Sequence, residues 1–187
     1  MSRIIVDSIR NSSASSDGIT LSSDGKVAFP NTSTGKVLQA VQVVKTSKQS
    51  VQSQTMVDIT GFELTITPSA ASSKILLITT ITACCHSSGG FNLWRQIGSN
   101  SYSQLTTYIG DADGSRERYT MQMGQTQTAN VAERSMTILD SPNTTSAVKY
   151  KWQTGTPYNS NYVIVINSTA DDSLSLIHIS EPTRQDS

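Results

Sequence analysis

The sequence has little charge and no long apolar stretch. Charged residues make up 15% of its 187 residues, and 14 basic and 14 acidic side chains give a formal net charge of zero. A broad nucleic-acid footprint or a polybasic membrane segment needs a basic surface, so this balance argues against both. The longest runs of consecutive apolar residues, such as 75–78, are far shorter than the roughly 18 residues that a transmembrane helix needs.

The first ten residues lack the features of a secretory signal peptide. Only three apolar residues follow Arg3 before Asp7, and no small-residue cleavage site comes after them. We therefore expect the chain to be made in a cytoplasm and not to be exported by that route.

Cysteine is scarce, and Cys84 and Cys85 are the only two. Neighbouring residues on a strand point to opposite faces, which makes these two poor disulfide partners. We interpret both as reduced, one as core filler and the other as a small edge residue.

Good helix formers are also scarce. Glu occurs four times, whereas Ser and Thr together account for 53 residues and β-branched residues are abundant. No segment shows convincing helical periodicity. This composition predicts an all-β protein.

Residues 1–35 differ from the rest of the chain. They are rich in Ser, Asp and Gly, and the turn dipeptides Asp17-Gly18 and Asp24-Gly25 each precede a short β-like run. A segment with so few apolar residues cannot form a buried core within one chain. It is either disordered or a thin β-like stem that packs against copies from other subunits.

Residues 36–173 have the pattern of one β domain. Apolar and polar residues alternate in several runs, and residues 75–85 form a longer run typical of a central strand buried on both faces. Turn residues such as Asp140-Ser141-Pro142-Asn143 separate the runs. About eight or nine strands are expected, arranged as an antiparallel β-sandwich or jelly roll. The predicted strands are 37–44, 62–67, 75–85, 91–97, 118–123, 136–138, 148–153 and 162–166.

Residues 174–184 read LSLIHISEPTR, which matches the translation of a transposase-type sequencing-library adapter. We interpret residues 174–187 as adapter-derived and exclude them from the fold argument. His178 is then not native, and the natural sequence is interrupted at about residue 173. The alternative is a real strand, because Leu174, Leu176 and Ile177 are apolar.

No catalytic signature is present. The sequence has no nucleophile elbow, no phosphate-binding loop, no dinucleotide-binding glycine pattern and no zinc-protease motif. His86, beside Cys85 at a strand end, is the only histidine outside the adapter-like tail, and we interpret it as a loop residue. We predict a protein that is not an enzyme and that needs no cofactor.

Two groups of residues are candidates for binding. Tyr102, Tyr108 and Tyr158 lie in polar, turn-rich segments, where an aromatic ring can stack on a sugar, anchor an interface or simply cap the edge of a sandwich. The second group resembles an acidic calcium loop, but positions 5 and 12 of that loop lack the usual ligands and Arg116 and Arg118 add positive charge. We therefore predict no metal and interpret the loop as a solvated turn. Its carboxylates are Asp111, Asp113 and Glu117.

Several segments resemble small virion structural proteins of tailed bacteriophages, especially those assembled from marine metagenomes. The similarity spans residues 1–173 and is carried by RIIVDSIRNSSASSDGITLSSDGKVAFP, GKVLQAVQVVKT, FELTITPSAASSKILL and LDSPNTTSAVKYKWQ. The resemblance implies an N-terminal attachment or stem segment and a jelly-roll head similar to the trimeric heads of complement C1q and tumour necrosis factor. It also implies one more apolar C-terminal strand, which the adapter replaces. It assigns no functional residue.

We expect a homotrimeric tail-fibre or receptor-binding component. Its expected partners are copies of itself, other virion proteins through the N-terminal segment, and a glycan or protein of the host surface, with no nucleic acid and no membrane insertion. It would be made in the host cytoplasm and reside in the virion tail.

Three alternatives remain. The first is a monomeric carbohydrate-binding sandwich module. The second is a polysaccharide depolymerase, which needs paired carboxylates, whereas Glu63, Glu117 and Glu133 have no Asp obviously placed beside them. The third is a secreted eukaryotic ligand with a C1q-like head.

Overall fold

The structure is a computed structural model of the 187-residue chain. It describes residues 8–9, 13, 18–21, 23, 27–28, 37–115, 117–126, 130–157 and 161–170. The chain divides into two compact units, residues 1–38 and 39–187. The predicted boundary at residue 35 lies among residues that the structure does not describe, as does the adapter-like segment 174–187.

The N-terminal unit contains a small antiparallel sheet in the order β1-β2-β3. The amide of Gly18, in the first turn dipeptide, donates a hydrogen bond of 3.0 Å to the carbonyl of Ile9. Three apolar side chains of this sheet are exposed, with Ile9 55%, Leu21 40% and Val27 53% accessible, and Ile19 is half-buried. Its strands are β1 (Ser8–Ile9), β2 (Ile19–Leu21) and β3 (Val27–Ala28).

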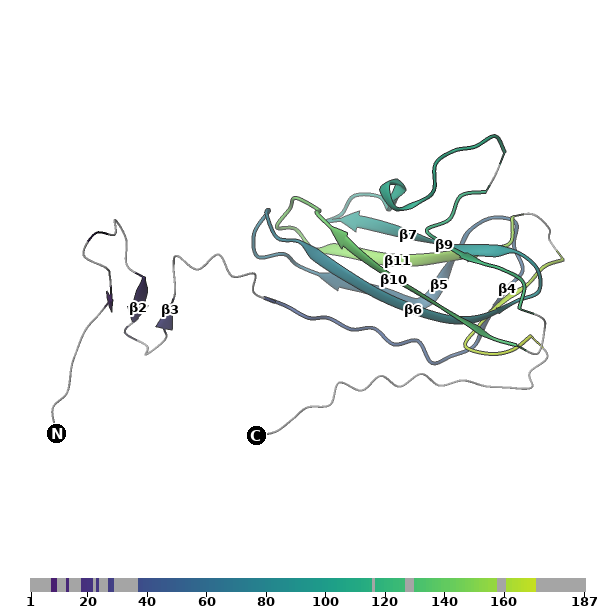
Figure 1. Ribbon diagram of the computed structural model, residues 1–187, viewed down its shortest axis with the longest axis horizontal. Coiled ribbons are helices and arrows are strands. Elements are labelled where there is room, and N and C mark those ends of the chain that lie inside the picture. The colour runs from purple at the N-terminus through teal and green to yellow at the C-terminus, as the bar shows by residue number, and fades with distance from the viewer. Residues whose placement is uncertain are drawn as a thin grey trace. The chain divides into compact units, whose positions relative to one another are not determined.

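The second unit is an antiparallel β-sandwich (Figure 1). Its described residues form nine strands and one short 3-10 helix, η1 (Thr106–Tyr108), and no described helix has the length and hydrophobicity to cross a membrane. One sheet has the order β10-β6-β12-β4, and the other has the order β5-β11-β7-β8 with β9 also paired to β7. The strands are β4 (Gln49–Val51), β5 (Val57–Ile66), β6 (Ile75–Cys85), β7 (Gly89–Ile97), β8 (Ser103–Gln104), β9 (Met121–Met123), β10 (Ala132–Asp140), β11 (Val148–Gly155) and β12 (Ile164–Ile166).

The pairing of eight of these strands is nested. The first and last strands pair with each other (β4 with β12), then the next inward (β5 with β11), then β6 with β10 and finally β7 with β9. Such a folded-over hairpin, wound into two sheets, is the jelly-roll topology. The all-β, antiparallel jelly-roll sandwich predicted from the sequence is therefore confirmed.

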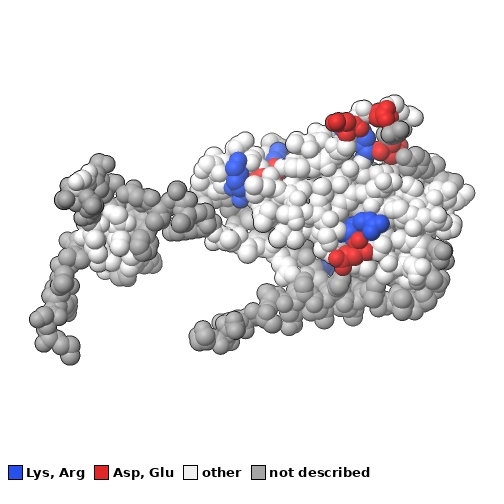
Figure 2. All heavy atoms as spheres, in the orientation of Figure 1, with Lys and Arg blue, Asp and Glu red and all other residues white. Residues whose placement is uncertain are grey.

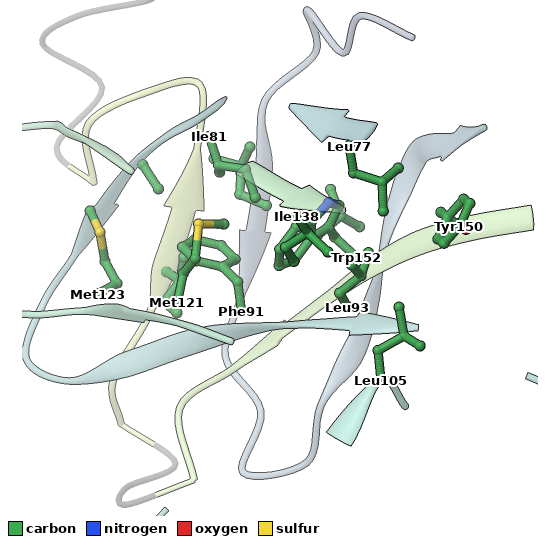
Figure 3. Close-up of a cluster of buried hydrophobic side chains, with 14 of the residues drawn as sticks. Leu77, Ile81, Phe91, Leu93, Leu105, Met121, Met123, Ile138, Tyr150 and Trp152 are labelled. Carbon is green, nitrogen blue, oxygen red and sulfur yellow. The ribbon is translucent and has the colours of Figure 1, made fainter. Parts of the chain in front are cut away.

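The core lies between the two sheets. Figure 3 shows Leu77, Ile81 and Ile138 from one sheet facing Phe91 and other apolar side chains from the opposite sheet. The odd-numbered residues of β6 point into this core, as the two-residue period of a strand requires. Trp152, predicted as a core residue, is also buried there.

Three predictions about individual strands are wrong. Residues 37–44, predicted as a strand, form no ladder, and the first strand of this unit begins at Gln49. The run 75–85 is β6 with the expected bounds, but Leu76 and Ile78 are exposed, so its first half is buried on one face only. Asp140, predicted as a turn residue, ends β10 and is buried.

Candidate functional site

The outer face of the β6–β10 pair is an exposed apolar surface. Leu76 and Leu139 lie directly opposite each other across the two strands, and Ile78 follows on the same face. Their side chains are 58%, 57% and 74% exposed. We call these three residues the outer patch. Large apolar side chains grouped on a solvated face are typical of an interaction surface.

Hydroxyl groups lie next to the outer patch on this face, and the exposed Glu133, opposite Thr82, follows beyond them. Thr137 lies opposite Ile78, and next to that pair Thr80 and Ser135 share a hydrogen bond of 3.0 Å between their hydroxyls. Figure 2 shows charged side chains as a few separate groups with wide uncharged areas between them. The outer patch itself holds no ionised group, and desolvating such a group is the most costly part of burying a surface.

Tyr102 belongs to a polar cluster at the other sheet. Its hydroxyl donates a short hydrogen bond to the Glu63 carboxylate, and the Lys151 ammonium lies 4.2 Å from the centre of its ring. Lys151 in turn lies 2.8 Å from the Asp58 carboxylate, to which the Gln153 amide also donates at 2.8 Å. One ring face of Tyr102 is thus already covered by a cation.

The same cluster shifts two ionisation equilibria. Burial raises the pKa of the Tyr102 phenol far above its usual value, and the hydrogen bond to Glu63 raises it further. Burial alone would raise the pKa of Asp58, but the hydrogen bonds from Lys151 and Gln153 outweigh it and lower that pKa below 3.8. Both groups therefore keep their ordinary charge states at neutral pH.

Tyr108 lies in η1, away from Tyr102. Its hydroxyl donates a hydrogen bond of 2.9 Å to the backbone carbonyl of Leu139, and its ring packs against the edge of the core. This contact ties the loop after β8 to the end of β10. Tyr158 lies outside the described residues. The structure thus places the two described tyrosines in separate contacts, and a ligand role for any of the three stays a prediction.

The acidic loop between η1 and β9 is exposed and carries the acidic side chains at the top right of Figure 2. Asp111, Asp113 and Glu117 border a hollow of about 240 Å³ together with Arg118 and Gln122. Across the part of the chain that the structure describes, no three His, Cys, Asp or Glu side chains are arranged to hold a metal ion.

Sequence reasoning missed a buried ionic group that joins the two sheets. Asp140 ends β10, and its carboxylate accepts hydrogen bonds of 2.8 Å from Arg95 on β7 and 2.5 Å from the Tyr150 hydroxyl on β11. Burial, with the hydrogen bond to Asp140, raises the pKa of Tyr150 far above its usual value. The sequence gives no spacing signal for this group, because its members come from three separate strands.

Cys84 and Cys85 are both free thiols and both fully buried. Cys85 is part of the core, whereas Cys84 points to the other side of β6 and is buried there too, so the prediction that one of the two is an edge residue is wrong. Burial raises the pKa of the Cys85 thiol, which disfavours the reactive thiolate. His86 is exposed and meets Tyr162 edge to face at 5.8 Å between ring centroids.

No protein-family model matches this sequence, and no curated protein matches it.

Proposed function

We propose that this chain is a non-enzymatic structural protein of a tailed-phage virion, a homotrimeric tail-fibre or receptor-binding component. The observation that carries the proposal is the outer patch, in which the exposed apolar side chains of Leu76, Ile78 and Leu139 lie together on one sheet face. The likeness of residues 1–173 to small phage virion proteins supplies the biological setting and the number of copies.

Association of identical chains would bury the exposed apolar side chains of the outer patch. Full burial of a Leu or Ile side chain contributes roughly 1.5–3 kcal/mol, and the outer patch itself carries no charge that would repel a second copy of it. Stable interfaces bury about 1,200–2,000 Å² in total, more than three side chains provide. The exposed apolar residues of the N-terminal sheet offer further surface for the same association. These residues are Ile9, Leu21 and Val27.

The proposed role follows from this assembly. The N-terminal unit would attach to other virion proteins, and the heads would contact a glycan or protein of the host surface. Three identical heads multiply a weak contact, because after the first binding event the others become intramolecular. The protein would be made in the host cytoplasm and reside in the virion tail.

Light scattering on a sizing column tests the proposal with the full chain. A mass near three times 20.1 kDa supports the trimer, and Ile78→Lys should reduce it to one protomer by placing a charge in the outer patch. Thr65→Lys is the matched control, since Thr65 is exposed on a strand of the other sheet. A monomeric wild-type chain would contradict the fibre proposal and favour a single carbohydrate-binding module.

Two further assays test the receptor-binding role and the non-enzymatic assignment. One measures binding to host cells, and the other measures cleavage of host polysaccharide. The trimer should bind whole host cells and leave their purified polysaccharide uncleaved. Release of reducing sugar ends would show a depolymerase and overturn the non-enzymatic assignment.

A further inference from the structure

The outer face of the sheet β5-β11-β7-β8 differs in chemistry from the outer patch. Alternate residues of β7 and β11 point away from the core, because Phe91, Leu93 and Trp152 point into it. The outward side chains of these two strands are aromatic, amide or cationic, and none is aliphatic. Lys is depleted at the core of protein interfaces, so this face matches a protein partner poorly. The outward side chains are Asn92, Trp94 and Gln96 on β7 and Lys149, Lys151 and Gln153 on β11.

Trp94 has hydrogen-bonding side chains on both sides across this face. The strand registers place Gln104 of β8 opposite Trp94 on one side and Lys151 of β11 opposite it on the other. Lys149, two residues before Lys151, is a diagonal neighbour of Trp94. Diagonal pairs on a sheet are within reach of long side chains. Trp94 itself is half-buried, so part of its indole is open to solvent.

The side chains around Trp94 fall into two groups by their hydrogen bonding. Lys151 and Tyr102 are held in place by the polar cluster described above. The side chains of Gln104 and Lys149, by contrast, have no hydrogen-bond or ion-pair partner among the described residues. The first group is therefore fixed before any ligand arrives, and the second offers an amide and an ammonium group to one.

The Trp94 indole N–H is a third hydrogen-bond donor at this place. It is shielded from solvent, and the described residues supply no acceptor for it. A buried indole N–H usually has an acceptor, and leaving it unpaired lowers stability. An oxygen atom that enters beside Trp94 would satisfy this donor. Three donors and an aromatic ring together favour a ligand that has several oxygen acceptors and an apolar face of its own.

We propose that this face, at Trp94, Gln104 and Lys149, binds a hexopyranose unit of a surface glycan. A pyranose combines a face of C–H groups, which stacks on the indole ring, with hydroxyl groups that both donate and accept. The Gln104 amide and the Lys149 ammonium would bond to these hydroxyls, and a hydroxyl beyond the edge of the ring would accept from the indole N–H. Tyr102 is a positioning residue, since it contacts Lys151 beside Trp94.

The inference rests on the proposed function, in which each head contacts a glycan or protein of the host surface, and it names the glycan and the face. The outer patch lies on the opposite sheet of the sandwich. Association through the outer patch therefore leaves the face at Trp94 accessible. Several such faces on one assembly would strengthen a weak contact with a repeating glycan.

Fluorine NMR of the full chain labelled with fluorotryptophan tests the inference. The chain has two tryptophans, so Trp94 and the core residue Trp152 give one signal each, and Trp94→Phe assigns them. The probes are glucose, galactose, mannose, N-acetylglucosamine and glucuronic acid, each titrated to about 50 mM. At least one of them should shift the Trp94 signal saturably and leave the Trp152 signal unchanged.

Three variants locate the bound sugar. Gln104→Ala should weaken binding about threefold to tenfold, because it removes one hydrogen bond. Thr67→Ala is the matched control, since Thr67 is exposed just beyond β5, and it should bind as the unaltered chain does. Trp94→Ala should abolish binding, measured by transfer of saturation from the protein to the sugar signals. All three should keep the mass and the unfolding midpoint of the unaltered chain.

Two results would overturn the inference. One is a Trp94 signal that none of the five sugars shifts, and the other is binding that Trp94→Ala and Gln104→Ala leave intact. The mass in solution separates the two proposals. A trimer that binds none of the sugars would overturn the glycan site and leave the virion proposal with a host protein as its receptor. A monomer that binds a sugar at Trp94 would support the site and contradict the trimer.

Discussion

Arg95 and Asp140 join the two sheets of the sandwich. One guanidinium nitrogen of Arg95 on β7 lies 2.8 Å from both carboxylate oxygens of Asp140 at the end of β10. The Tyr150 hydroxyl and the Ser141 amide also donate to this carboxylate. The negative charge is therefore fully hydrogen-bonded, which is the condition under which a buried carboxylate is tolerated.

Asp140→Ala should destabilise the fold by about 3 kcal/mol, because it leaves the mostly buried Arg95 without its counter-charge. The free energy of unfolding in urea, at one fixed protein concentration, measures this. Asp113→Ala, in the exposed loop, is the control and should change it by less than about 0.5 kcal/mol. The double variant Arg95→Met/Asp140→Leu should be more stable than Asp140→Ala. A loss below about 1 kcal/mol in Asp140→Ala would refute the bridging role.

Gly90→Ala should also destabilise the sandwich, for a steric reason. A Cβ atom at Gly90 would lie 2.2 Å from the ring of Tyr119, and the ladders on both sides of β7 hold the backbone in place. Overpacking of this kind costs about 1–3 kcal/mol. Gly110→Ala is the control, because no atom lies within 4 Å of the added carbon. Equal stability of the two variants in thermal or urea unfolding would show that Tyr119 moves aside freely.

The position and type of most strands could be predicted from the sequence, because apolar alternation and turn residues mark them directly. The bounds of β6 were predicted correctly from its dense apolar run. The short strands β4 and β8 went unpredicted, since neither lies in a run of alternating apolar and polar residues. Residues 37–44 do not form the predicted strand, because a strand needs a neighbouring strand for its backbone hydrogen bonds. The local sequence pattern does not show which strands become neighbours.

The outer patch could not have been found from the sequence. Leu76, Leu77 and Ile78 are consecutive apolar residues, and such a run is typical of a strand buried on both faces. Only the pairing of β6 within a two-layer sandwich shows which of them lack a covering layer. The Arg95–Asp140 contact could not be predicted from the sequence either, since 45 positions separate the two residues.

Truncation of two neighbouring residues of β6 should therefore change the free energy of unfolding by very different amounts. Leu77→Ala removes a core side chain and should cost about 2–5 kcal/mol of unfolding free energy. Leu76→Ala shortens an exposed side chain and should cost the dilute protomer less than about 1 kcal/mol, while weakening self-association. Urea unfolding at low concentration and light scattering at high concentration separate the two effects. A stability loss in Leu76→Ala as large as in Leu77→Ala would show that Leu76 is covered within one chain.

The Asp58–Lys151 pair should make stability depend on pH in the acid range. The pKa of Asp58 is lowered below 3.8 in the folded state, so the folded chain binds fewer protons than the unfolded chain there. The stabilisation from this group is therefore complete above the unfolded value and is lost as the pH falls through the lower folded value.

Asp58→Asn should lower the free energy of unfolding by less than about 1 kcal/mol at pH 7, because the Asp58 side chain is 52% exposed to screening water. The difference from the unaltered chain should vanish as the pH falls below 3.8. In a Lys151→Met background, where the main partner of Asp58 is gone, Asp58→Asn should have little effect at either pH. An undiminished difference in that background would assign the stabilisation to Gln153, whose amide donates to the same carboxylate.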